Sequence, residues 1–338
     1  MPTASLADMI TVLNATQLRK ALPMDQCIQA MRRAYAALSR GEAQVPLRAR
    51  LPVPPHEAVS LFMPAYVQAE SGESLAVKVV SLYPHNISRD LPLIHAAVLV
   101  LEAHTGRPVA LLEGGVLTAL RTGAASGAAT DLLARPDSHV AAIFGAGVQG
   151  RTQLEAVCTV REIHTAWVYD PNPERMADFI HALAGAGPIP TDLRQAATPA
   201  QAVAQADVIC AATTSSEPVF ADHDLKPGVH INGVGSYTPE MQEIPPETVR
   251  RACIVVDSRS AVLAEAGDLI QPISLGLITP EHIQAEIGEL VSGQKPGRTD
   301  PGQITFFKSV GVAVQDAVAA QLALENAHKL GLGQQVEW

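Results

Sequence analysis

The sequence is poor in aromatic residues and in charge: 4% of its 338 residues are Phe, Trp or Tyr, and 17% are Asp, Glu, Lys or Arg. Acidic residues outnumber basic ones by 34 to 24, which gives a formal net charge of -10 at pH 7. A nucleic-acid partner or an anionic membrane surface would favour a basic face, so this balance argues against both. We therefore expect no nucleic-acid partner and no membrane association.

Cysteine is also scarce, and a long apolar run is absent. The four cysteines, Cys27, Cys158, Cys210 and Cys253, lie far apart and form no Cys-x-x-Cys pair, which indicates neither a zinc site nor a disulfide framework. Asp8 stands where a signal peptide would have a basic start, and no run reaches the roughly eighteen apolar residues of a membrane span. These absences predict a cytoplasmic protein with buried free thiols and no bound metal.

What the sequence does contain is a change of pattern along a chain long enough for two domains. Up to about residue 115, a predicted helix over 24–38 precedes short apolar runs separated by turn residues, which is typical of an α+β unit with hairpins. From about 139 to 258, short continuous apolar strands alternate with helical segments, which predicts a parallel sheet covered on both faces. After residue 303, the sequence predicts a short strand and one long helix.

A glycine motif stands at the start of the alternating zone. In IFGAGVQG, Gly145, Gly147 and Gly150 complete G-x-G-x-x-G after the apolar strand VAAIF and before a helical segment. In this context the first glycine allows a tight turn, the second lets the backbone approach a pyrophosphate, and the third lets the helix pack on the strand. The motif predicts a dinucleotide-binding site, with a glycine turn in an unrelated α/β protein as the alternative.

The next strand, TAWVYD, ends in Asp170, twenty residues beyond the last motif glycine. A carboxylate there can accept hydrogen bonds from the adenosine ribose hydroxyls and repels a 2′-phosphate, which favours NAD over NADP. The alternative role for Asp170 is a helix cap. Pro171, Asn172 and Pro173 follow without an arginine, although Arg175 is close enough to keep NADP as an alternative.

The N-terminal zone contributes three cations in apolar or tightly packed settings: Arg48, Lys78 and Arg121. A cation inside a buried strand is costly unless an anion meets it. The alternatives are a charge that protects an edge strand for Lys78 and a helix-surface charge for Arg121. Small residues follow Arg121 in GAASGAA, so we expect that helix to lie close against a neighbouring backbone and near the dinucleotide.

These stretches together resemble the ornithine cyclodeaminase and mu-crystallin family over nearly the whole chain. The matching segments are PLRARLPV, AVKVVSLYPHN, LTALRTGAASG, FGAGVQG, HINGVGSYTPEMQEI and ITFFKSVGVAVQD. The resemblance implies an α/β fold in which a Rossmann domain that binds NAD, residues 117–309, is inserted into an α+β domain for substrate binding and dimerisation, residues 1–116 plus 310–338. It also implies a homodimer and a small amino or imino acid as substrate.

The resemblance further implies the site residues. Arg48, Lys78 and Arg121 would bind the substrate carboxylate, and Lys308, Ser309 and Gly311 would close the pocket beside the nicotinamide, unless that last segment is a simple strand-to-helix junction. The dinucleotide would be bound by residues of the glycine loop and of the later strand ends: Arg121, Thr122, Gly145, Ala146, Gly147, Val148, Gln149, Asp170, Thr213, Asn232, Gly233, Val234, Ser309 and Gly311.

The sequence departs from the family at one position that bears on the chemistry. Cyclodeaminases and archaeal-type alanine dehydrogenases carry an aspartate where this sequence has Tyr237. Cyclodeamination needs a base, and a tyrosine with an ordinary pKa near about 10 is a poor substitute for a carboxylate. Pro92, Leu93 and Ile94 also replace polar residues of many relatives, which suits a hydrocarbon ring or a short side chain.

The sequence thus predicts an NAD(H)-dependent reductase of a C=N bond next to a carboxylate. A cyclic imino acid such as pyrroline-2-carboxylate or piperideine-2-carboxylate would become an L-amino acid, with a proton from Lys78, Tyr237 or water. The alternatives are an ornithine cyclodeaminase, an amino-acid dehydrogenase like alanine dehydrogenase, and a non-catalytic ligand-binding protein like mu-crystallin.

Overall fold

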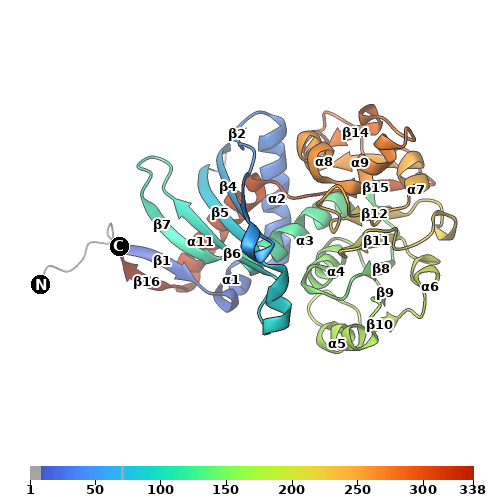
Figure 1. Ribbon diagram of the computed structural model, residues 1–338, viewed down its shortest axis with the longest axis horizontal. Coiled ribbons are helices and arrows are strands. Elements are labelled where there is room, and N and C mark those ends of the chain that lie inside the picture. The colour runs from blue at the N-terminus through green and yellow to red at the C-terminus, as the bar shows by residue number, and fades with distance from the viewer. Residues whose placement is uncertain (1–8, 70–71) are drawn as a thin grey trace, which may run out of the picture. The chain divides into compact units, whose positions relative to one another are not determined.

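The computed structural model describes residues 9–69 and 72–338, so Asp8 lies outside the described residues. The chain forms two compact units (Figure 1). Unit 1 combines the chain up to Arg121 with Val312–Trp338, and unit 2 comprises Thr122–Gly311. Among the described residues, no helix has both the length and the apolar character to cross a membrane.

Unit 1 is built on an eight-stranded sheet in the order β16-β1-β7-β6-β5-β4-β2, with β3 paired to β4. Its pairs are antiparallel except that β1 runs parallel to β7. The strands are β1 (Met9–Leu13), β2 (Ala43–Gln44), β3 (Ala49–Val53), β4 (Ala58–Ala69), β5 (Gly72–Leu82), β6 (Ile94–Leu101), β7 (Pro108–Glu113) and β16 (Gln334–Glu337). The helices are α1 (Ala15–Ala21), α2 (Met24–Ser39) and α11 (Ala313–Leu330), with the 3-10 turns η2 (Pro54–His56) and η3 (Pro84–Arg89).

The two faces of this sheet differ because side chains alternate along each strand. Along β5, Ala76, Lys78 and Val80 are buried, whereas Val77 and Val79 are partly exposed. The helix α11 packs on β4 and β5 and contacts α1 and α2. The predicted N-terminal helix and the antiparallel hairpins are thereby confirmed.

Unit 2 is built on an eight-stranded parallel sheet in the order β10-β9-β8-β11-β12-β15-β13-β14. The strands are β8 (Val140–Phe144), β9 (Thr165–Tyr169), β10 (Asp192–Gln195), β11 (Val208–Ala211), β12 (His230–Gly233), β13 (Cys253–Val256), β14 (Ile283–Glu286) and β15 (Thr305–Lys308). The helices are α4 (Val148–Val160), α5 (Pro173–Leu183), α6 (Pro199–Val203), α7 (Pro246–Arg251), α8 (Arg259–Glu265), α9 (Gly267–Ser274) and α10 (Ile287–Val291), with the 3-10 turns η4 (Asp222–Asp224) and η5 (Pro280–His282). The helix α3 (Gly114–Leu133) runs through the boundary between the units in the sequence.

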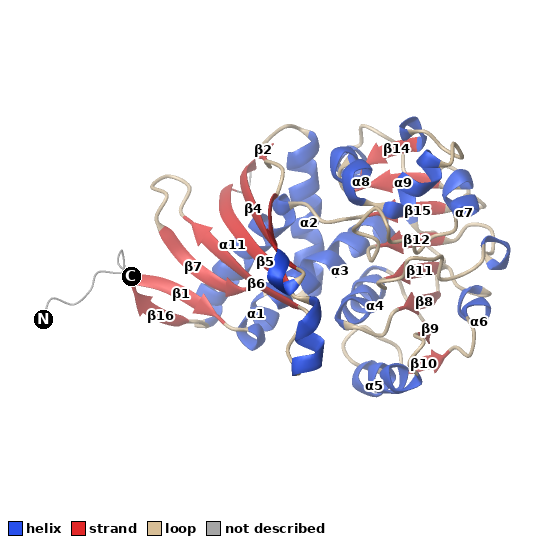
Figure 2. Cartoon of the chain, in the orientation of Figure 1, coloured by secondary structure: helices blue, strands red, loops and turns tan. Residues whose placement is uncertain are grey.

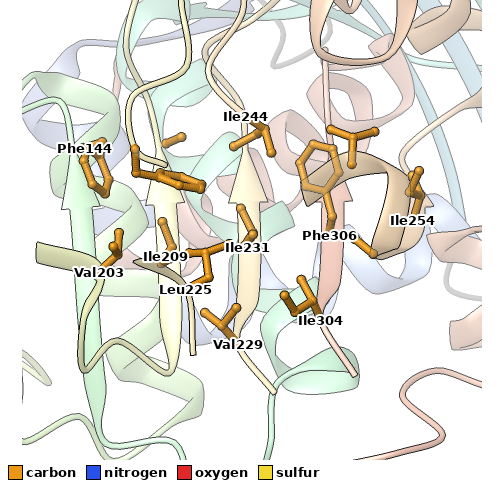
Figure 3. Close-up of a cluster of buried hydrophobic side chains, with 14 of the residues drawn as sticks. Phe144, Val203, Ile209, Leu225, Val229, Ile231, Ile244, Ile254, Ile304 and Phe306 are labelled. Carbon is orange, nitrogen blue, oxygen red and sulfur yellow. The ribbon is translucent and has the colours of Figure 1, made fainter. Parts of the chain in front are cut away.

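Both faces of the parallel sheet are covered, as the continuous apolar strands predict. Figure 2 shows α4 and α5 on one side of the strands and α6 and α7 on the other. One hydrophobic cluster contains Ile209, Ile231 and Phe306, which lie on one face of three adjacent strands (Figure 3). A second cluster contains Val208 and Cys210 from the opposite face of β11. The expected α/β class with a doubly covered parallel sheet is therefore confirmed.

Two strands of unit 2 were not predicted, and both are edge strands. The sequence of β10 is DLRQ and that of β14 is IQAE. An edge strand has one partner and exposes part of its side chains, so it lacks the continuous apolar run that identifies the inner strands.

The strand order of this sheet reverses between β8 and β11. Dinucleotides bind at such a reversal, beyond the carboxyl ends of the strands.

Candidate active site

The glycine loop after β8 has the geometry that the motif predicts. Gly145 has φ +95°, and a Cβ there would lie 2.5 Å from the carbonyl oxygen of Ala212. A Cβ at Gly150 would lie 2.0 Å from the carbonyl oxygen of Gly145, so the helix can approach the strand only without a side chain. A Cβ at Gly147 would meet no heavy atom within 4 Å. The first and third glycines are therefore needed for close packing within the protein. The second faces open space, where the pyrophosphate of a dinucleotide would approach.

The helix α4 begins directly at this opening. Its N-cap is Gly147, which offers no side-chain hydrogen bond to the first turn, and Val148 is 68% exposed. The first N–H groups of a helix need a partner, and an anion in front of them is stabilised. Within the described residues, the buried Oε1 of Gln149 has no hydrogen-bond partner. The open first turn of α4 fits the pyrophosphate of a dinucleotide, whereas the Gln149 oxygen is an acceptor and would need a donor instead.

Asp170 lies beside the glycine loop at the end of β9. It is 7% exposed and accepts hydrogen bonds from the backbone N–H of Ala146 and of Asn172, both at 3.0 Å. The N-cap of α5 is Asn172, whose side chain accepts the N–H groups of Glu174 and Arg175. The alternative role of Asp170 as a helix cap is therefore wrong, and its carboxylate lies beside the glycine loop.

The small residues after Arg121 also behave as expected. A Cβ at Gly123 in α3 would lie 2.5 Å from the carbonyl oxygen of Thr152 in α4, so the two helices are in backbone contact at this point. Thr122 is buried, and its carbonyl accepts a hydrogen bond from Gln153 Nε2 at 3.3 Å. The expectation that α3 lies close against a neighbouring backbone is confirmed.

The later predicted cofactor residues follow the carboxyl ends of β11, β12 and β15. Thr213 donates its N–H and its hydroxyl to Glu243. Gly233 ends β12, and the N–H of Val234 bonds to the carbonyl of Ala211. The side chain of Asn232 is fully buried, where Oδ1 lies 3.2 Å from His230 Nε2 and Nδ2 donates to Thr130 at 3.0 Å.

The segment after β15 is held by a second buried carboxylate. Asp257 accepts hydrogen bonds from the Ser309 hydroxyl at 2.7 Å and from the N–H groups of Val310 and Gly311 at 3.0 and 2.8 Å. Burial raises the pKa of Asp257, and these donors oppose that effect. The ammonium of Lys308 is fully buried against Asp268, so its ion pair joins the end of β15 to α9.

In unit 1, Lys78 and Arg121 converge on one carboxylate. Lys78 Nζ lies 2.7 Å from Asp316 Oδ2, and Arg121 Nε lies 3.1 Å from Asp316 Oδ1. Arg121 Nη1 also donates to Gln315 Oε1 at 3.0 Å. Lys78 is 2% exposed on a strand paired on both sides, and Arg121 is 5% exposed. The edge-strand and helix-surface alternatives are therefore both wrong.

Charge and burial oppose each other in this cationic cluster, which consists of Arg48, Lys78, Arg121 and Asp316. Burial lowers the pKa of Lys78 to about 8; Asp316 opposes that shift, and the nearby charges of Arg121 and Arg48 add to it. Burial would raise the pKa of Asp316, but Arg121 and Lys78 outweigh it and hold that pKa below its ordinary value. Three cations against one carboxylate leave an excess of two positive charges when Lys78 is protonated. The cluster can therefore accept an anionic ligand.

Asp316 is a candidate site residue that the sequence motifs did not single out. It lies in the first turn of α11 within the motif ITFFKSVGVAVQD. The available signal was a single carboxylate in an otherwise apolar helix start, since such a group is buried only with a partner. Its partners come from β5 and α3, and the sequence pattern does not show that pairing.

Tyr237 lies in unit 2 beyond β12, and its environment bears on whether its phenol can act in place of a carboxylate base. Burial raises the pKa of its phenol. The group therefore stays neutral at ordinary pH and does not replace a carboxylate base.

The segment Pro92, Leu93 and Ile94 lies in unit 1. The carbonyls of Pro92 and Leu93 accept hydrogen bonds from Asn86 and Tyr83, and Ile94 begins β6 with 42% exposure.

A parallel sheet with a reversed strand order, an open glycine loop and a carboxylate beside it define a dinucleotide-binding α/β protein, and unit 1 adds a cluster suited to a carboxylate ligand. The chain belongs to the ornithine cyclodeaminase/mu-crystallin family, whose sequence model matches residues 9–330. This finding confirms the resemblance seen in the sequence motifs.

Named relatives cover the chain almost end to end. A Delta(1)-pyrroline-2-carboxylate reductase from Bacillus cereus is 38% identical over 97% of this chain and 99% of the relative. The solved structure of the Thermococcus litoralis Delta(1)-pyrroline-2-carboxylate reductase in complex with NADH and L-proline is 44% identical, with a TM-score of 0.92 over 97% of this chain and 100% of that one. An archaeal alanine dehydrogenase dimer with bound NAD is 30% identical, with a TM-score of 0.89 over 98% of this chain and 99% of that one.

Proposed function

We propose that this protein is an NADH-dependent reductase of a cyclic imino acid, foremost Δ1-pyrroline-2-carboxylate, which it converts to L-proline. The observation that carries the proposal is the cationic cluster, in which a buried lysine with a pKa of about 8 shares Asp316 with Arg121 and feels the charge of Arg48. The relatives named Delta(1)-pyrroline-2-carboxylate reductase support the same substrate class.

Unit 2 would hold the cofactor. The open backbone at Gly147 and the start of α4 fit the pyrophosphate, and Asp170 fits the adenosine ribose diol of NAD. The bound reduced nicotinamide supplies a hydride to the imine carbon. The loops after β11, β12 and β15 would form the nicotinamide end of this site.

Unit 1 would hold the imino acid. Arg48 and Arg121 bind the carboxylate, since planar guanidinium groups match its geometry. Lys78 donates a proton to the ring nitrogen, which makes the adjacent carbon more electrophilic. One hydride on carbon and one proton on nitrogen complete the conversion of the imine to the amine, and Lys78 recovers its proton from water. Asp316 keeps the ammonium in place through its ion pair.

The cyclodeaminase alternative is disfavoured by Tyr237. Cyclodeamination must remove ammonia and move several protons in one site, and a half-buried neutral phenol cannot supply a carboxylate's charge. Reduction of a preformed imine needs only a hydride, a carboxylate site and one proton. The ligand-binding alternative leaves the buried, proton-bearing lysine without a role.

We also propose that the protein is a homodimer formed through the uncovered face of the unit 1 sheet. An apolar row crosses adjacent strands on that face through Val12, Leu111, Leu99, Val77 and Pro64. All five are exposed or partly exposed, which is costly over so many adjacent strands unless a second surface covers them. A second copy supplies an identical apolar row for this purpose, and the dimeric archaeal alanine dehydrogenase supports this choice.

The test is NADH oxidation by purified protein with Δ1-pyrroline-2-carboxylate or piperideine-2-carboxylate, followed by chiral amino-acid analysis. We expect NADH consumption that depends on the imine and yields an equal amount of the L-amino acid. Parallel reactions contain pyruvate with ammonia, and L-ornithine with NAD. Conversion of ornithine to proline, or turnover of pyruvate but of no cyclic imine, would overturn the proposal, and no turnover at all would favour a ligand-binding protein.

A further inference from the structure

We propose that Glu243 is a positioning residue for the nicotinamide end of the cofactor site, because its carboxylate joins the loops that follow β11 and β12. The inference rests on the proposed use of NADH. Glu243 touches neither substrate nor reacting atoms in this scheme; it acts through the backbone of Thr213, Gly235 and Ser236.

Four donors converge on this carboxylate, which is fully buried. Oε1 accepts the N–H of Thr213 at 2.6 Å and its hydroxyl at 2.8 Å. Oε2 accepts the N–H groups of Gly235 at 2.7 Å and Ser236 at 3.1 Å. One side chain thus satisfies backbone donors from two different strand-end loops, which otherwise would be buried without partners.

The backbone at Glu243 is itself fixed by a second buried carboxylate, that of Asp268. Asp268 Oδ1 accepts the N–H groups of Glu243 at 2.7 Å and Ile244 at 3.0 Å, and Asp268 Oδ2 pairs with Lys308 Nζ at 2.9 Å. Lys308 is the last residue of β15. The network therefore connects the carboxyl ends of three adjacent strands, β11, β12 and β15.

The Thr213 loop, which Glu243 holds in place, packs directly against both the Gly235 loop and the glycine loop. A Cβ at Gly235 would lie 2.1 Å from the carbonyl oxygen of Thr213 and 2.4 Å from Glu243 Oε1, so the two loops touch through backbone atoms. On its other side, the Thr213 loop abuts the glycine loop, since a Cβ at Gly145 would lie 3.3 Å from Thr213 Cγ2. A displaced Thr213 loop would therefore move the wall beside the dinucleotide.

The hydrogen-bond pattern requires the charged form of Glu243. Burial and the neighbouring Asp268 raise its pKa, whereas Lys308 and the donors of Thr213 favour ionisation. Each carboxylate oxygen already accepts two donors, so a proton on either oxygen would face N–H groups. An amide at this position would have the same defect.

The test compares Glu243→Gln with Asp207→Asn, a matched loss of a buried carboxylate from the same unit. Asp207 accepts the N–H groups of His139 and Val140 at 2.8 and 2.9 Å, but at the amino-terminal edge of the sheet. We expect Glu243→Gln to raise the Kd for NADH, measured by fluorescence titration without substrate, by at least about tenfold (about 1.4 kcal/mol). Asp207→Asn should lower Tm yet leave that Kd within about twofold.

A second readout uses the protein without any ligand. Amide hydrogen exchange at Thr213, Gly235 and Ser236 should accelerate in Glu243→Gln and stay unchanged in Asp207→Asn. Glu243→Asp keeps the charge with a shorter reach, so it should give an intermediate Kd and serves as the test variant if the glutamine variant does not fold.

An unchanged NADH Kd in both Glu243 variants, or an equal loss in Asp207→Asn, would overturn the inference and leave Glu243 as a stabilising residue only. These measurements do not involve an imino acid. A protein that binds NADH but reduces no cyclic imine would therefore refute the proposed function without touching this inference.

Discussion

At the scale of single residues, Lys78 shows how the fold prepares a proton donor. Burial disfavours its charge, and Asp316 at 2.7 Å opposes that effect. The resulting pKa of about 8 is close to ordinary working pH, where a general acid is most effective. A lysine with an ordinary pKa would hold its proton more tightly.

The first residue-scale prediction concerns pH. Only protonated Lys78 can donate, so kcat/KM for imine reduction should be level below the pKa of Lys78 and should fall as pH rises through about 8. Lys78→Met should reduce kcat/KM by about a hundredfold or more, in line with loss of a buried charge contact, and should abolish the fall near pH 8. The measurement is a pH profile of NADH oxidation at saturating NADH.

A control variant separates this role from general charge effects. Lys226→Met removes the ion pair of a partly exposed lysine with Asp207 in unit 2 and should keep the wild-type pH profile. A fall near pH 8 that persists in Lys78→Met would assign the proton to another group.

At the scale of elements, the six-residue glycine loop contains one glycine that is needed for packing and another that lies where the cofactor is proposed to bind. A side chain at Gly150 would clash because α4 packs on the loop, whereas one at Gly147 would meet no protein atom and would point to where the cofactor is proposed to bind. The motif alone assigns the packing role and the binding role by analogy with other dinucleotide-binding loops. The distances from a Cβ built at each glycine show which of the two would clash with the protein.

The element-scale prediction is that alanine has opposite effects at these two glycines. Gly147 has φ -83° and open space in front of it, so Gly147→Ala should keep Tm within a few degrees while weakening NADH binding about tenfold or more. Gly150→Ala places a Cβ at 2.0 Å from a carbonyl oxygen and should cost about 1–3 kcal/mol of unfolding free energy. Thermal unfolding and NADH titration of both variants check this, and equal Tm values would refute the assignment.

At the scale of the whole molecule, the proposed chemistry is divided between two units made from interleaved segments. Unit 1 takes both ends of the chain, and unit 2 is the segment between them. The same sheet in unit 1 carries Lys78 on its helix-covered face and the apolar row on the other. Association through that row would therefore stiffen the strand that holds the proton donor.

The whole-molecule prediction concerns association. Leu111 is 39% exposed and lies between Val12 and Leu99 in the apolar row, so Leu111→Asp should convert a dimer into monomers because a buried unpaired charge opposes the interface. Leu275, which is 68% exposed in unit 2, provides the control, and Leu275→Asp should remain dimeric. Sedimentation equilibrium measures both, and a wild-type monomer or an unaffected Leu111→Asp dimer would contradict the proposed interface.

Features that depend on neighbours along the chain could be predicted from the amino-acid sequence. The alternation of apolar strands with helices, the glycine motif and the position of Asp170 each need only local order, because periodicity and turn chemistry are local properties. The inner strands of unit 2 and the long C-terminal helix were predictable for the same reason. The edge strands β10 and β14 were not, since their apolar signal is diluted by exposure.

Tertiary structure alone decided which charges meet. Arg121 and Asp316 are 195 residues apart in sequence, and Thr213 and Glu243 are 30 apart, yet each pair is in hydrogen-bond contact. A sequence shows that a buried cation needs an anion, but many carboxylates could serve, and only packing selects one. The sequence therefore did not show which groups Asp316, Glu243 and Asp257 contact, because those pairings depend on desolvation and distance.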